Sequence, residues 1–81
     1  MFTYRLYFQE NGKTMEASSA QSHFPPESDQ GREMVLNKYK LANKAEFKTP
    51  CAVAVSDKVG ARTWFNRHGQ PVEEEKAFQG A

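Results

Sequence analysis

A chain of 81 residues, 38% apolar and 26% charged, has the composition of one globular domain, which excludes a disordered chain. Its net charge of +1 excludes nucleic-acid binding driven by total charge alone, and its single cysteine excludes an intrachain disulfide. No apolar run approaches the ~18–20 residues of a membrane span, and the N-terminus lacks the regions of a signal peptide. We therefore expect a cytoplasmic protein.

The charges are unevenly distributed along the chain. Residues 32–68 carry eight basic side chains against three acidic ones, whereas the remaining residues carry three basic and seven acidic ones. The middle of the chain is therefore basic and its two ends are acidic.

The stretch FTYRLYFQENGKTMEASSA, residues 2–20, predicts a β-hairpin. Asn11-Gly12 suits a two-residue type I′ turn, in which both central residues need a positive φ. This turn predicts that Tyr7 faces Glu16, Leu6 faces Ala17 and Tyr4 faces Ser19. One face would then be apolar, and the other would carry Arg5, Tyr7, Glu16 and Ser18.

A helix is predicted next, with Ser28 or Asp29 as its cap, a start near Gln30 and an end between Asn43 and Glu46. Its buried stripe is predicted to contain Met34, Val35, Tyr39, Leu41, Ala42 and Ala45. Lys38 falls inside this stripe, and we expect its stem to pack along the core edge while its ammonium reaches water. Lys40 and Lys44 lie on the opposite, basic face.

The stretch CAVAVSDKVGARTWFN, residues 51–66, predicts a second hairpin. Gly60 suits a three-residue loop with a bulge, which pairs Ala54 with Trp64 and Val53 with Phe65. Phe65 would then lie in the core, and Trp64 would point away from it. A four-residue loop would shift the pairing by one residue and exchange the two aromatic side chains.

The sum is ββαββ: an α+β fold of two layers, in which one helix covers one face of a four-stranded antiparallel sheet. Residues 1–70 would form this domain. Residues 71–81, with the acidic run Glu73–Glu75, are expected to form a flexible tail, and the alternative is that Val72 and Phe78 dock it.

No catalytic arrangement is recognisable in the sequence. His23 and His68 lie in separate loop segments, and Cys51 begins an apolar strand, where a free cysteine usually behaves as a small buried hydrophobe. No metal-ligand spacing occurs, and carboxylates in a flexible tail cannot be held at a fixed separation. We therefore expect a protein that is not an enzyme and needs no cofactor.

The candidate site is the sheet face that a single helix leaves open. It would carry Trp, Tyr and Arg side chains, the types enriched at interface hot spots. The candidate binding residues are Arg5, Tyr7, Glu16, Arg62, Trp64 and Arg67, with Lys40 and Lys44 as a secondary basic face.

These features predict a small interaction module that acts as a stoichiometric inhibitor or adaptor of a larger complex. A nucleoprotein complex is one such target. Small chains of this kind are used by phages and mobile elements to obstruct host machinery, and by this association we expect such a source. The alternative is a single-stranded nucleic-acid binder that stacks bases on Trp64 or Phe65 and contacts phosphates through Lys and Arg. A third reading is a homodimer through the open face or an edge strand.

Overall fold

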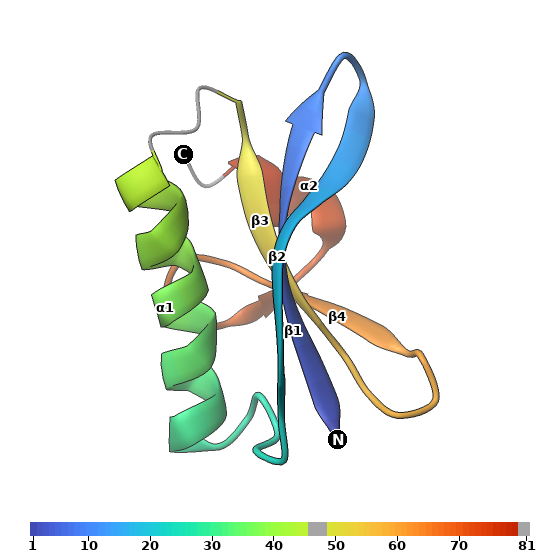
Figure 1. Ribbon diagram of the computed structural model, residues 1–81, viewed down its shortest axis with the longest axis vertical. Coiled ribbons are helices and arrows are strands. Elements are labelled where there is room, and N and C mark those ends of the chain that lie inside the picture. The colour runs from blue at the N-terminus through green and yellow to red at the C-terminus, as the bar shows by residue number, and fades with distance from the viewer. Residues whose placement is uncertain (46–48, 80–81) are drawn as a thin grey trace.

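The computed structural model describes residues 1–45 and 49–79, which form an α+β fold (Figure 1). Its elements in chain order are β1 (Phe2–Glu10), β2 (Lys13–Ser22), α1 (Asp29–Ala45), β3 (Cys51–Ser56), β4 (Arg62–Phe65), β5 (Pro71–Val72) and α2 (Glu74–Gln79). The five strands form one antiparallel sheet in the order β2-β1-β3-β4-β5. The predicted α+β class is confirmed, whereas the predicted four strands and one helix match only roughly, because β5 and α2 are additional.

The first hairpin has the predicted turn. Asn11 and Gly12 have φ values of 52° and 76°, and Tyr7 pairs with Glu16 as expected. Beyond that pair a β-bulge shifts the register, so that Leu6 pairs with Ser18.

The predicted pairs of Leu6 with Ala17 and of Tyr4 with Ser19 are therefore wrong. A bulge adds one residue to one strand, and here that residue is Ala17, so Tyr4 pairs with Ala20. A two-residue turn fixes the register only as far as the ladder stays regular. The bulge places small side chains of β2 on the side of the sheet that faces α1.

Helix α1 begins at the predicted cap and extends to Ala45, while Glu46, the far limit of the predicted end, lies outside the described residues. The backbone N–H of Gly31 donates a hydrogen bond to Ser28 Oγ at 3.0 Å, which makes Ser28 the N-cap. Gly31 is required, because a Cβ there would lie 1.9 Å from the carbonyl oxygen of Pro25. The buried residues are Gly31, Val35, Tyr39 and Ala42, whereas Leu41, predicted to be buried, is 43% exposed.

The main core lies between α1 and the sheet. Its buried members are Tyr4, Leu6, Val35, Tyr39, Ala42, Cys51, Val53, Val55 and Phe65. The second hairpin has the predicted three-residue loop: Asp57 N–H donates to the carbonyl oxygen of Ala61 at 3.0 Å, and Gly60 has a φ of 87°. Val53 pairs with Phe65, so Phe65 faces α1 and Trp64 faces the other side, as expected.

The segment after residue 70 differs from the expected tail. Residues 71–79 form β5 and α2, and α2 lies on the sheet face opposite α1 (Figure 1). Asn66 organises the turn before β5, because its Oδ1 accepts hydrogen bonds from the N–H groups of His68 and Gln70 at 2.9 and 3.0 Å. Residues 80–81 lie outside the described residues.

A second core lies under α2. It consists of Tyr7, Ala52, Ala54, Trp64, Ala77 and Phe78, with Val72 at its edge. Trp64 contacts Phe78 at a ring-centroid distance of 5.3 Å and is only 8% exposed. The prediction of a fully open second sheet face is therefore wrong. The small side chains of Ala52 and Ala54 leave room for α2, which turns its apolar residues to the sheet and its glutamates to water.

Candidate functional site: an arginine patch beside α2

The second sheet face keeps an exposed polar area next to α2. We call it the arginine patch and define it as Arg5, Glu16, Ser56 and Arg62, which come from β1, β2, β3 and β4 in turn. Residues two apart on a strand, and residues paired across strands, share a face of the sheet. Arg5 pairs with Ala54, which lies two residues before Ser56, and Ser56 pairs with Arg62. Glu16 pairs with Tyr7, which lies two residues after Arg5, so all four patch residues share one face.

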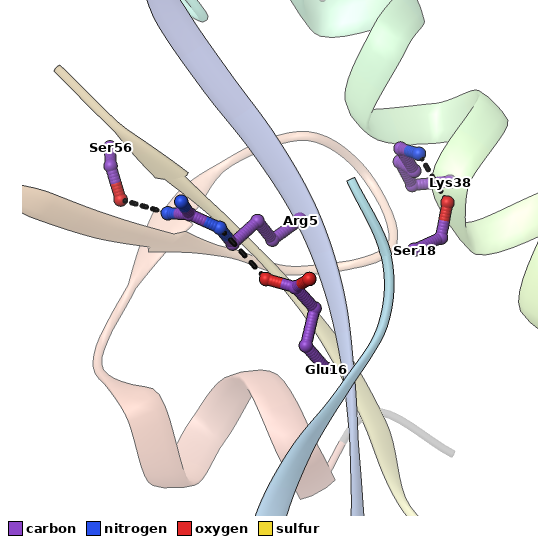
Figure 2. Close-up of polar contacts among 5 residues, drawn as sticks. All are labelled: Arg5, Glu16, Ser18, Lys38 and Ser56. Carbon is purple, nitrogen blue, oxygen red and sulfur yellow. Dashed lines mark hydrogen bonds and ion pairs between the residues drawn. The ribbon is translucent and has the colours of Figure 1, made fainter. Parts of the chain in front are cut away.

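Arg5 is held by two contacts within the patch (Figure 2). Its Nε lies 2.9 Å from Glu16 Oε1, and its Nη1 donates a hydrogen bond to Ser56 Oγ at 3.2 Å. Ser56 is only 9% exposed, whereas the side chains of Arg5 and Glu16 are 32% and 49% exposed. Arg5 is therefore fixed in direction and its charge is already balanced by Glu16.

Arg62 is exposed and rests on two buried aromatic rings. Its guanidinium carbon lies 5.1 Å from the ring centroid of Tyr7 and 5.7 Å from that of Trp64. Both distances fit cation–π contacts, and Tyr7 and Trp64 support each other at 5.2 Å. Within residues 1–45 and 49–79, no carboxylate forms an ion pair with Arg62. The patch thus presents one cation, held against two rings, that has no ion-pair partner within the described part of the chain.

Tyr7 and Trp64 occupy different roles from those predicted. They lie on the predicted face, but they are 7% and 8% exposed, because they belong to the second core with Ala77 and Phe78 of α2. Phe65, the alternative outward ring, is 3% exposed. None of the three rings therefore offers an open face, and Tyr7 and Trp64 instead support the exposed Arg62.

The other predicted basic residues do not join this patch. Arg67 contacts α1: its Nη1 donates to Asn43 Oδ1 at 3.0 Å, and its guanidinium lies 5.3 Å from the ring of Tyr39. Lys40 and Lys44 are exposed on α1, on the opposite side of the sheet. The structure thus brings together five of the eight predicted residues, which are Arg5, Tyr7, Glu16, Arg62 and Trp64.

Ser56 is the patch residue that the sequence reasoning missed. The correctly predicted hairpin register places it directly across from Arg62, on the same face, and this pairing was the signal that could have identified it.

Cys51 is the single cysteine of the chain, and it is buried. Burial raises the pKa of the Cys51 thiol, while the nearby Arg67 lowers it, and the thiol donates to the carbonyl oxygen of Thr49 at 3.4 Å. In the part of the chain that the structure describes, no three His, Cys, Asp or Glu side chains are grouped as metal ligands. Neither described helix has the length and apolar character needed to cross a bilayer.

Comparison of the chain with protein-family models, with curated proteins and with solved structures found no significant match.

Proposed function

We propose that this protein is a non-catalytic protein-binding module, a stoichiometric inhibitor or adaptor, whose contact centre is the arginine patch. The partner surface would present an acidic side chain to Arg62. The observation that carries the proposal is that Arg62 is exposed, rests on two rings, and has no ion-pair partner among the described residues.

Two physical reasons support this assignment. A guanidinium held against aromatic rings has fewer rotamers to lose on binding, which reduces the entropy cost of association. Its planar fork can also bind a carboxylate through two parallel hydrogen bonds. Arginine supported by a packed aromatic cluster is typical of interface hot spots.

The test is affinity capture from a lysate of the native host, with and without nuclease, using the wild-type chain, Arg62→Ala and Lys58→Ala. Lys58 is an exposed cation in the turn between β3 and β4, so it serves as the matched control. We expect one protein to be retained by the wild type and by Lys58→Ala after nuclease treatment. The binding free energy between this retained protein and Arg62→Ala should be weaker than for the wild type by about 2 kcal/mol or more, as expected for a hot spot.

Single-stranded nucleic acid is the second candidate, because Arg5 and Arg62 lie on one face where both could contact phosphates. The buried Tyr7, Trp64 and Phe65 rings argue against base stacking in this arrangement. The nucleic-acid candidate would be favoured if nuclease treatment removed all retained protein and if nucleic acid were recovered from the untreated sample. That result would contradict the protein-binding proposal.

A further inference from the structure

Strand β2 is an edge of the sheet, and its second half is weakly protected. It runs from Lys13 to Ser22, and its neighbour among the described strands is β1. Natural edge strands are usually protected by charged residues, proline, a β-bulge or a covering element. In β2 the charges are Lys13 and Glu16, and the bulge lies at Ala17. Residues 18–22 contain neither a charge nor a proline, so their outward backbone N–H and C=O groups are available to an added strand.

Helix α1 is closed on one flank and open on the other. The turn between β4 and β5 closes the first flank, where Arg67 bonds Asn43 and Gly69 lies against the side chain of Arg32. On the flank beside β2 there is a groove of about 280 Å³. It is lined by Ala20, Met34, Asn37, Lys38 and Leu41.

The groove exists because β2 carries small side chains on the face toward α1. Ser18 and Ala20 pair with Leu6 and Tyr4, so they point to the α1 side without filling it. Leu41, which forms an apolar wall of the groove, is consequently 43% exposed. An added strand beside β2 would place its own side chains into this space, since directly paired residues of neighbouring strands share a face.

A partly buried cation lies in the groove. The ammonium of Lys38 donates to Ser18 Oγ at 2.6 Å, as Figure 2 shows on the α1 side. Burial lowers the pKa of Lys38, and the charge of Glu16 opposes this shift without cancelling it. Glu16 is already paired with Arg5, and no carboxylate of the described residues forms an ion pair with Lys38. The groove therefore combines an apolar wall with a cation that an acidic group would complement.

We propose that β2 and this groove bind an extended segment of a partner protein, which adds to the sheet next to β2. The segment carries an acidic side chain opposite Ser18, within reach of Lys38, and an apolar side chain opposite Ala20, against Met34. These two positions are two residues apart, so the recognised pattern is acidic-x-apolar or its reverse. Backbone hydrogen bonds supply affinity and the two side chains supply specificity, as in other strand-addition complexes. This site goes beyond the arginine patch, because it lies on the opposite side of the sheet.

A second copy of this chain complements the groove less well. Two copies related by a two-fold axis would pair β2 with β2 and set their open α1 flanks side by side. Each flank carries its own Lys38, so like charges would meet where the acidic group is required.

The test uses a display library of random heptapeptides, selected on the full chain, followed by affinity measurement on synthetic versions of the enriched peptides. We expect an acidic and an apolar residue two positions apart in those peptides. Binding should slow hydrogen exchange of the outward amides of β2. Replacing the acidic residue of the peptide by its amide, or Lys38→Met in the protein, should weaken binding by about tenfold.

Lys40→Met is the matched control, because Lys40 lies exposed on the same helix outside the groove, and it should bind within about twofold of the wild type. Leu41→Ser removes an exposed wall residue and provides a second variant with little risk to folding. The proposal would be overturned if the selection gave no binders, or if the peptides bound Lys38→Met and Leu41→Ser as tightly as the wild type. Unchanged hydrogen exchange of the β2 amides on peptide binding would also overturn it. A stable dimer with β2 amides protected in the absence of peptide would also overturn it.

Discussion

At the scale of single residues, Tyr39 joins the helix to two strands. Its hydroxyl donates a hydrogen bond to the carbonyl oxygen of Phe65 on β4 and accepts one from the N–H of Val53 on β3 at 3.2 Å. The side chain is only 3% exposed, so neither backbone group has water as a ready substitute. This one hydroxyl therefore fixes how α1 sits on the middle of the sheet.

Removing that hydroxyl should destabilise the fold. We expect Tyr39→Phe to lower the free energy of unfolding by about 1–3 kcal/mol, because it leaves a buried donor and a buried acceptor unsatisfied. Urea denaturation measures this change. Tyr7→Phe is the control, since no hydrogen bond of the Tyr7 hydroxyl is found among the described residues, and it should stay within about 0.5 kcal/mol of the wild type. Equal losses in both variants would contradict the assigned role.

Residue-scale features were also the ones that the sequence predicted best. The Asn11-Gly12 turn, the Ser28 cap and the Gly60 loop each depend on a few neighbouring residues and on the φ values or hydrogen bonds that those residues favour. The bulge at Ala17 was not predicted, because it depends on which β2 side chains must face α1.

At the scale of elements, α2 decides how much of the second sheet face is exposed. Only two of its described side chains, Ala77 and Phe78, are buried, and both pack on the cluster around Trp64. A six-residue helix that begins with glutamates has too few apolar residues to show a helical period. Its position depends on tertiary contact with the sheet, which is why the sequence predicted a flexible tail.

Phe78→Ala should therefore affect both stability and the environment of Trp64. We expect a loss of about 3 kcal/mol, the lower end of the range for a buried phenylalanine. Trp64 fluorescence should shift to the red as the indole meets water. Glu75→Ala, an exposed change in the same helix, should leave the emission unchanged. An unshifted emission in Phe78→Ala would show that α2 does not cover Trp64.

At the scale of the whole molecule, the strand order places the two exposed features on opposite sides of one sheet. The α+β class, both hairpins and the main helix followed from patterns in the sequence. The order β2-β1-β3-β4-β5 did not, because the crossover through α1 joins strands that lie on either side of β1. Three of the four arginine-patch residues, Arg5, Glu16 and Arg62, were predicted from the sequence, and Ser56 was not. The burial of Tyr7 and Trp64 was not predicted either, because it depends on the second core that forms with α2.

The most direct measurement is the affinity between the purified chain and its captured target as the salt concentration rises, for the wild type and Arg62→Ala. The account predicts a 1:1 complex that Arg62→Ala weakens and that loses less than about tenfold in affinity between ~50 and ~200 mM salt. A fall of about 10³–10⁵ over that range, the signature of six to ten phosphate contacts, would contradict a protein-binding role. Equal affinities for the wild type and Arg62→Ala would contradict the arginine patch as its contact centre.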